Sequence, residues 1–178
     1  MLLSSPIVSE RIILRNPNDA DAHGAYAAWM NDPDVTRFLE SRFASHTPHS
    51  LRAFIASMRD DPDSLFLAIE RGDDGRHIGN IKIGPIDRHH MSAAMGVIVG
   101  DKQSSGRGFA TEAIRVAAQH AFQYMGVEKL WAGCYAPNVA SIRAFERAGF
   151  VREGHLHRHW RLAGNEFVDG ILLGRVKD

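Results

Sequence analysis

Disulfide bonds, a net charge and a long hydrophobic run are all missing from this sequence of 178 residues. Cys134 is the only cysteine, so no disulfide can form within the chain, which fits a reducing compartment. No stretch reaches the ~20 apolar residues that a membrane span needs. Residues 1–6 lack the basic start and the apolar run of a signal peptide. We therefore expect a cytoplasmic protein.

The balance of charge excludes two classes of partner. Lys and Arg together number 21, and so do Asp and Glu, which gives a formal net charge of zero. Binding along nucleic acid needs a basic face, and binding to an anionic membrane surface needs a basic cluster. We expect neither partner. A hydrophobic content of 44% suits one domain with a sizeable core, spanning residues 1–178.

Apolar periodicity predicts alternating strands and helices. Strands are predicted over residues 7–14, 65–70, 77–83, 93–100, 129–134, 150–157 and 166–173. Helices are predicted over 19–30 (with Asp19 as the N-cap), 48–59, 107–125 and 138–149. Helix 107–125 joins two strands in a βαβ crossover, which makes those strands parallel. The sequence therefore predicts an α/β (α+β) fold, with a mixed, mostly antiparallel central sheet, one parallel βαβ unit and helices on both faces.

The loop before helix 107–125 contains two glycines and reads Gln103-Ser-Ser-Gly106-Arg107-Gly108. Glycines let the backbone turn tightly and leave amide N–H groups uncovered. These groups meet the positive end of the helix dipole, which makes a site for a phosphate or pyrophosphate. The sequence thus predicts a phosphorylated small-molecule ligand.

Three other interpretations of this loop differ in the residues they require. A plain turn is the simplest. A dinucleotide-binding loop is disfavoured because Thr111 stands at its third glycine position and the following strand does not end at an acidic residue. A kinase-type phosphate loop lacks its Gly-Lys-Ser/Thr.

The same loop carries a family resemblance. Gln103-x-x-Gly106-x-Gly108-x-Ala110 matches the Q/R-x-x-G-x-G/A signature of the GNAT superfamily of acyl-CoA-dependent N-acetyltransferases. Asn138-x-x-Ser141, followed by FERAGF at 145–150, resembles the family's later N-x-x-S…(Y/F)-E-K-x-G-F segment. WMNDPDVTRFL at 29–39 is similar to the first-helix region of a subgroup with ribosomal-protein N-terminal, polyamine and amino-sugar acetyltransferases. The resemblance covers nearly the whole chain.

The resemblance implies acetyl-CoA as the cofactor and a sheet that splays apart where it binds. Backbone amides of the glycine loop would hold the pyrophosphate. Strand residues 97–99 would carry a bulge, flank the pantetheine arm and polarise the acetyl carbonyl with a free N–H group. The cofactor-binding residues so implied are Val97, Ile98, Val99, Gln103, Ser104, Ser105, Gly106, Arg107, Gly108, Phe109, Ala110, Thr111, Asn138, Ser141, Phe145 and Arg147.

The departing thiolate needs a proton donor. Many relatives use a tyrosine just before E-K-x-G-F, where this chain has Phe145, which has no proton to donate. We expect Ser141, one turn earlier, to substitute directly or through water, and Tyr135 is a second candidate. A purely structural role for Ser141 at the start of the helix stays open, as does an N-cap role for Asn138 beside ligand contact.

The general base is not assigned by the sequence. Relatives often carry a glutamate in A-E-I-G, where this chain has Ala94. Candidates are His89, His90, Glu40 and Asp32, of which histidine is best matched to neutral pH. Of the two histidines, His90 is taken as the catalytic candidate, and a solvated loop pair is the alternative.

The acceptor would lie between the 29–39 region and the C-terminal hairpin. Trp29 could line this site, with core burial as the alternative, while Asp32 and Glu40 could attract an ammonium group. His155 and His157 alternate with His159 and would share one face of a strand. Because no carboxylate accompanies them in the pattern, we expect a solvated or substrate-facing strand and no metal.

These observations predict transfer of an acetyl group from acetyl-CoA to a primary amine, by direct attack through a tetrahedral intermediate. The acceptor would be a small amine or amino sugar, or a protein N-terminus of the ribosomal type. By analogy with the subgroup, the chain could form a homodimer. The alternative is a non-catalytic acyl-CoA-binding regulatory domain. Phe145 and Ala94 would fit that alternative, whereas Asn138 and Ser141 argue against it.

Overall fold

The computed structural model describes residues 1–162, 164 and 166–178. Within them an eight-stranded sheet has the order β1-β2-β3-β4-β5-β6-β8-β7. Only β5 and β6 pair in parallel among the described strands. The mixed, mostly antiparallel sheet is therefore confirmed. The strands are β1 (Ile7–Val8), β2 (Ile12–Arg15), β3 (Leu65–Arg71), β4 (His77–Asp87), β5 (Ser92–Val99), β6 (Lys129–Tyr135), β7 (Val151–Arg161) and β8 (Phe167–Val176).

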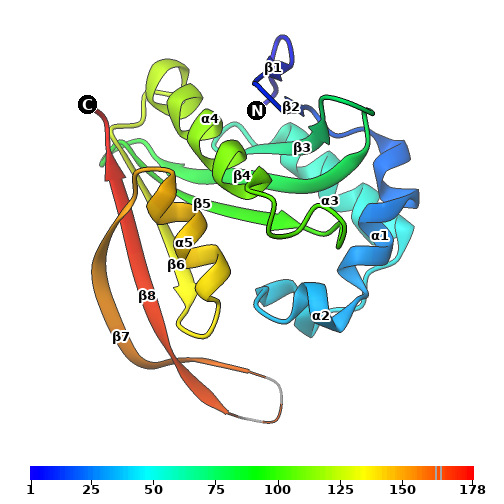
Figure 1. Ribbon diagram of the computed structural model, residues 1–178. Coiled ribbons are helices and arrows are strands. Elements are labelled where there is room, and N and C mark those ends of the chain that lie inside the picture. The colour runs from blue at the N-terminus through cyan, green and yellow to red at the C-terminus, as the bar shows by residue number, and fades with distance from the viewer. Residues whose placement is uncertain (163, 165) are drawn as a thin grey trace.

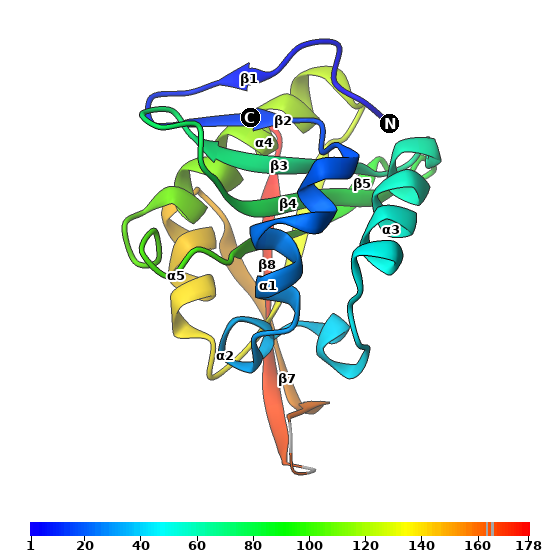
Figure 2. The same ribbon diagram turned by 90° about the vertical axis from the view of Figure 1, so that its right-hand side faces the viewer.

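Helices cover both faces of the sheet, as predicted (Figures 1 and 2). One face carries α4 (Phe109–Tyr124) and α5 (Val139–Arg147). The other carries the 3-10 helix η1 (Asp19–His23), α1 (Ala25–Met30) and α3 (Pro48–Asp60), with α2 (Pro33–Thr36) and the 3-10 helix η2 (Glu40–Phe43) between α1 and α3. In the described part of the chain, every helix is too short or too polar to cross a membrane.

A separate apolar core lies under each helical layer. Most of the apolar face of α4 is buried against the sheet, with Ala110 partly buried at its start, as expected for an amphipathic helix. On the other face, α1 and α3 pack against Phe66 of β3 and the partly buried Ile98 of β5. Residues at the end of β5 therefore contact both layers, since Val97 packs against the α4 core.

The sheet opens between β5 and β6. The two strands pair only over residues 92–94 and 129–131. Beyond that point β5 stays paired with β4 up to Val99, and β6 stays paired with β8 up to Tyr135, so the strands diverge (Figure 1). Alternate N–H groups of β5 then face the opening without a partner strand. The splay that the resemblance implied is present.

The implied bulge at residues 97–99 is wrong. Residues 95–99 pair with β4 in regular register, and the irregularity lies in β4, where Gly84 and Pro85 stand opposite Ala94. Proline lacks the N–H that a ladder needs, so the interruption falls at that residue.

The N-terminal segment also differs from the prediction. Residues 7–14 form two strands, because the Ser9 N–H donates to the Ile12 carbonyl (2.9 Å) and closes a turn. Residues 19–30 form η1 and α1, separated at Gly24. Asn18 replaces Asp19 as the N-cap, since its side chain accepts from the Ala20 N–H (2.9 Å).

A largely buried histidine under α1 makes stability depend on pH. His77 contacts the Trp29 ring (5.1 Å between centroids), and its Nδ1 lies 3.5 Å from Asp21 Oδ1. Burial lowers the pKa of His77. Burial opposes ionisation of Asp21, yet hydrogen bonds from Arg15 and the Asn18 backbone lower its pKa overall. Both groups bind fewer protons when folded than when unfolded, so acid destabilises the fold.

We expect the melting temperature to fall as pH drops below about 6.5, the pKa of an unfolded histidine, and to fall further as Asp21 protonates. His77→Gln removes one of these proton sites. Its melting temperature should therefore decline less steeply between pH 7 and pH 5 than that of the wild type, measured by calorimetry. Equal slopes would contradict a role for His77.

Candidate active site

A cavity of about 440 Å³ and one of about 600 Å³ lie on either side of the end of β5. The larger, here the α4 cavity, lies at the N-terminus of α4. Most of the residues implied for the cofactor line it. They are Val97, Ile98, Val99, Ser104, Ser105, Gly106, Gly108, Phe109, Ala110, Thr111, Asn138, Ser141 and Arg147.

The glycine loop presents its backbone to this cavity. Gly106 (φ 73°) and Gly108 (φ 85°) are in the left-handed region, where a side chain is strained. None of the N–H groups of residues 106–111 donates a hydrogen bond within the described residues. They lie at the positive end of α4, a helix of 16 residues. This cradle fits an anionic group such as the pyrophosphate of acetyl-CoA.

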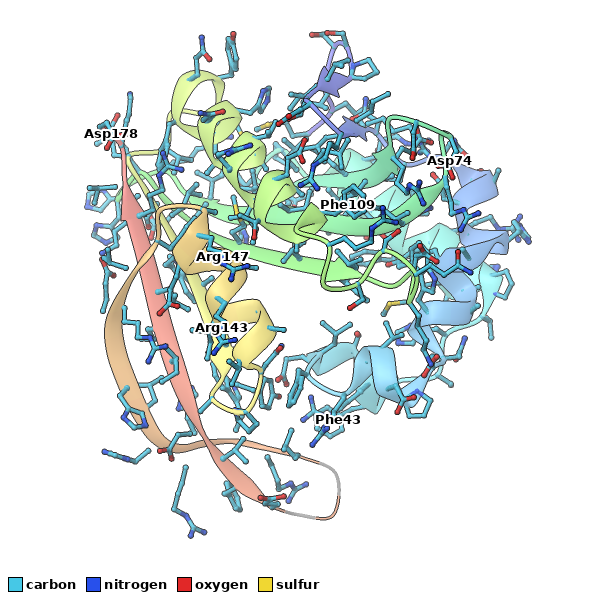
Figure 3. The ribbon with its side chains drawn as sticks, viewed as in Figure 1. Phe43, Asp74, Phe109, Arg143, Arg147 and Asp178 are labelled. Carbon is cyan, nitrogen blue, oxygen red and sulfur yellow. The ribbon has the colours of Figure 1, made fainter. Side chains whose placement is uncertain are left out.

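Two arginines add positive charge across from the loop. Arg143 and Arg147 are four residues apart on α5, so they share a face of the helix. Both line the α4 cavity, and Figure 3 shows them facing the start of α4 at Phe109. Guanidinium groups suit phosphate ligands. Arg143 was missed by the motif comparison, although its spacing from Arg147 was a usable signal.

Arg11 braces the loop from the β1–β2 turn. Its backbone N–H and its Nε each donate to the Glu112 carboxylate at 2.8 Å, and its Nη1 donates to the Arg107 carbonyl at 3.0 Å. Burial opposes ionisation of Glu112, but these Arg11 donors help to hold its pKa below the usual value. The loop is thereby tied to the first turn of α4.

Three residues implied for the cofactor are not among those that line the α4 cavity. Gln103 is exposed and accepts from Arg76 Nη1 (3.1 Å). Arg107 stacks over the Phe109 ring. Phe145 is buried in the α4 core against Phe150 (5.1 Å between centroids). Their side chains make contacts within the protein, and among the described residues the Arg107 N–H remains one of the unpaired groups of the loop.

Ser141 lies at the start of α5 on the wall of the α4 cavity. Its N–H donates to Asn138 Oδ1 (3.3 Å), so Asn138 is the N-cap. Its Oγ is 3.4 Å from Cys134 Sγ. Burial raises the pKa of Cys134, which keeps the thiol protonated. The Ser141 hydroxyl lines the cavity, whereas Cys134 is not among the described residues that line it.

Tyr135 lies outside both cavities, where its hydroxyl is held by charged groups. It donates to Glu40 and accepts from Arg42 Nη1 (3.0 Å), and its ring stacks on Trp160 (4.9 Å). Burial raises the pKa of Tyr135. In this structure the proton of Tyr135 is directed to Glu40 and away from both cavities.

The remaining sequence candidates lie elsewhere. His90 precedes β5, at the opposite end of that strand from Val97, and its N–H donates to Asp87. Trp29 is buried, as the core alternative predicted. Asp32 caps α2 and pairs with Lys102 (2.8 Å).

The smaller cavity, here the α3 cavity, lies between α1, η2, α3 and the sheet face of β3, β4 and β5. It shares Leu39, Val97 and Ile98 with the α4 cavity, so the two spaces meet at the end of β5. No aspartate or glutamate is among its described lining residues. These are Tyr26, Met30, Leu39, Ser41, Ala44, Ser45, His46, Ser50, Leu51, Phe54, Phe66, Asn80, Lys82, Gly96, Val97 and Ile98.

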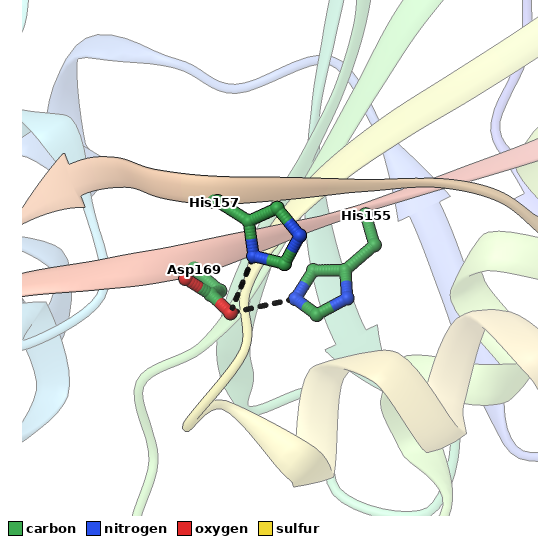
Figure 4. Close-up of side chains that lie close together, drawn as sticks. All are labelled: His155, His157 and Asp169. Carbon is green, nitrogen blue, oxygen red and sulfur yellow. Dashed lines mark hydrogen bonds and ion pairs between the residues drawn. The ribbon is translucent and has the colours of Figure 1, made fainter.

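A kink at Arg158 separates His159 from His155 and His157 on β7. His155 Nε2 and His157 Nδ1 lie 2.7 and 3.6 Å from Asp169 Oδ2 on β8 (Figure 4). Arg158 has φ 50°, and its N–H donates to Asp169 Oδ1 (2.8 Å). His159 is outside this cluster, and its ring lies against Trp160 (4.8 Å between centroids). The carboxylate that the pattern lacked comes from the partner strand, and the three ligand atoms lie within 4.8 Å of one another.

Comparisons with known proteins assign the family. The family described as "Acetyltransferase (GNAT) domain" matches residues 11–151. The uncharacterized N-acetyltransferase YoaA of Bacillus subtilis (strain 168) is 28% identical over 165 residues, which are 92% of each chain.

Solved structures share the fold. The ribosomal L7/L12 alpha-N-protein acetyltransferase RimL in complex with coenzyme A superposes with a TM-score of 0.84 at 16% identity, covering 97% of both chains. Spermidine N-acetyltransferase from Vibrio cholerae, in complex with CoA and spermine, has a TM-score of 0.81 at 20% identity, covering 93% of this chain and 95% of that one. The chain belongs to the GNAT family of acetyl-CoA-dependent N-acetyltransferases.

Proposed function

We propose that the α4 cavity holds acetyl-CoA, that the α3 cavity holds a primary amine, and that the amine attacks the thioester directly. The observation that carries this proposal is the junction of the two cavities at Leu39, Val97 and Ile98. Transfer without a covalent enzyme intermediate needs both reactants in contact at one point. A domain that only sensed acyl-CoA would have no need of the second cavity.

Acetyl-CoA would be bound by backbone N–H groups more than by side chains. The N–H groups of residues 106–111 would hold the pyrophosphate, with Arg143 and Arg147 opposite. An unpaired N–H at the end of β5 would stabilise charge on the carbonyl oxygen. Acetyl-CoA supplies the activated acetyl group, and Ser141 would give a proton to the leaving sulfur.

We infer that the base for the amine comes from the α3 cavity, at a position that the sequence did not indicate. The titratable side chains among its described lining residues are Tyr26, His46 and Lys82. Burial raises the pKa of Tyr26 to about 12, so it stays protonated. His46 Nε2 lies 2.8 Å from the Ser41 carbonyl and must donate to it, which leaves Nδ1 as the acceptor. We assign the base role to His46.

His46→Gln should lower kcat/KM at pH 7 by roughly 10²-fold, a usual contribution of acid–base catalysis. The loss should shrink at higher pH, where the amine is deprotonated by solvent, and acetyl-CoA affinity should not change. His49→Gln is the matched control, since His49 is exposed on α3 and does not line the cavity. An unchanged rate for His46→Gln would remove it from the mechanism.

Direct attack is tested by incubating the protein with radiolabelled acetyl-CoA and no amine. The thiol near Ser141 is Cys134, whose burial and raised pKa disfavour it as a nucleophile. We expect no label on the denatured protein and intersecting initial-rate lines with both substrates. Label retained at Cys134 would instead show a two-step transfer through an acetyl-enzyme.

A further inference from the structure

The α3 cavity carries no described carboxylate on its wall, and its charged side chain is Lys82. A second or third ammonium group of a polyamine would enter this space without a counter-charge, which is unfavourable. The ammonium group of Lys82 would instead attract an anionic group on the acceptor. The charge of the cavity therefore disfavours polyamines and favours amines that also carry an anionic group.

Lys82 lies directly beside the point where the cavities meet. It pairs in register with Gly96 of β5 on one side and with Phe66 of β3 on the other. Among the described residues no carboxylate oxygen lies within 4.0 Å of its ammonium group. The hydrogen bond from the Asp63 N–H (2.8 Å) is the largest cause that lowers the pKa of Asp61, and the charge of Lys82 adds a smaller effect. Lys82 is thus available to a ligand.

Asn80 offers a second unpartnered polar group, two residues before Lys82 on the same face of β4. It is 2% exposed, and its Oδ1 has no hydrogen-bond partner. Asn80 pairs in register with Ile98, one of the residues shared by both cavities. An amide oxygen accepts from an amine N–H. A buried acceptor left unsatisfied is unfavourable, which points to a donor on the ligand.

Most of the remaining cavity surface is apolar and leaves room for a side chain. A Cβ on Gly96 would meet no atom within 4 Å, so the space beside Lys82 is open. Met30, Phe54 and Phe66 line the cavity and are apolar, and Phe54 and Phe66 meet edge to face at 5.1 Å. A volume of about 440 Å³ accommodates an aromatic or large aliphatic group.

We propose that the acceptor is a free α-amino acid with a large apolar side chain. Its amine would donate to Asn80 Oδ1, its carboxylate would pair with Lys82, and its side chain would pack on Phe66. In the reaction a nitrogen–carbon bond forms, the thioester carbon–sulfur bond breaks, and the products are the N-acetyl amino acid, CoA and one proton. This inference rests on the proposed transferase function and names its substrate class.

The test compares acceptors that differ in one group. Acetylation of L-phenylalanine, L-phenylalaninamide, phenethylamine and spermidine is followed by CoA release and product mass. We expect kcat/KM for L-phenylalanine to exceed that for phenethylamine by roughly 30-fold, about 2 kcal/mol for a charge-assisted contact. Phenylalaninamide, which keeps the α-carbon but lacks the charge, should resemble phenethylamine, and spermidine should be the poorest acceptor.

Variants of Lys82 then test whether this side chain causes the preference for L-phenylalanine. Lys82→Met should raise KM for L-phenylalanine by a much larger factor than KM for phenethylamine and leave kcat for L-phenylalanine within about twofold, as expected when a ground-state contact is lost. Lys82→Arg should keep the preference. Lys129→Met, which removes a surface lysine paired with Glu153 (2.8 Å), is the control.

Each outcome bears on one claim. Three results would overturn the amino-acid assignment and leave the transferase function intact. They are equal use of L-phenylalanine and phenethylamine, a preference for spermidine or for a peptide N-terminus, and equal losses for both amines in Lys82→Met. Acetyl-CoA binding without transfer to any amine would overturn both.

Discussion

Gly108→Glu is expected to lower the affinity for acetyl-CoA by at least ~100-fold, close to 3 kcal/mol of binding free energy. Gly108 has φ 85°, so any side chain there strains the loop. The new carboxylate would also lie among the N–H groups that would hold the pyrophosphate. Arg11 Nη2 lies 3.4 Å from the new Cβ but serves the Glu112 ion pair, which limits its ability to neutralise the charge.

Gly126→Glu is the matched control for this experiment. Gly126 also has a positive φ (67°), and a Cβ there would meet no atom within 4 Å. It follows the C-terminal end of α4, away from the glycine loop, so it imposes the same kind of backbone strain without touching the cavity. Calorimetry should show near wild-type affinity for Gly126→Glu. Wild-type affinity in Gly108→Glu would refute the placement of the pyrophosphate.

Ser141→Ala is expected to reduce turnover by roughly 10²-fold, because the leaving thiolate loses its proton donor. The Asn138 cap on the residue 141 N–H involves the backbone and persists in the variant, so the start of α5 should be preserved. The dissociation constant for acetyl-CoA should stay within about twofold, with kcat and kcat/KM falling together.

Ser141→Thr keeps a hydroxyl and should retain most of the turnover. The pair of variants separates proton donation from packing, since both change the side chain next to Cys134. If Ser141→Ala turns over at the wild-type rate, Ser141 serves only the start of α5, and the proton comes from solvent.

Local sequence signals were sufficient for the fold and for the position of the glycine loop at a cavity. The apolar stripe of α4 and the glycines at 106 and 108 are short-range patterns, and the structure places that stripe in the core and the loop at a cavity. The split between β1 and β2 was missed because Glu10 and Arg11 are compatible with an exposed strand as well as with a turn.

The acceptor half depends on contacts between distant residues. Tyr135 and Glu40 are 95 residues apart, and no local sequence pattern shows that their side chains are hydrogen-bonded to each other. His46 follows a 3-10 helix in an irregular segment, so no periodicity marks it, whereas the adjacent pair His89 and His90 was conspicuous. Asp169 lies beside the β7 histidines because of the β7–β8 register, which no local sequence pattern reveals.

The most direct test of the account is acetyl transfer read by product mass. The protein would be mixed with acetyl-CoA and a panel of amines containing apolar amino acids, polyamines, nucleotide-linked amino sugars and N-terminal peptides of ribosomal proteins. The account predicts one class of amine heavier by one acetyl group, with an equal amount of free CoA. Tight binding of acetyl-CoA with no acetylated amine would contradict it and leave a non-catalytic acyl-CoA-binding domain.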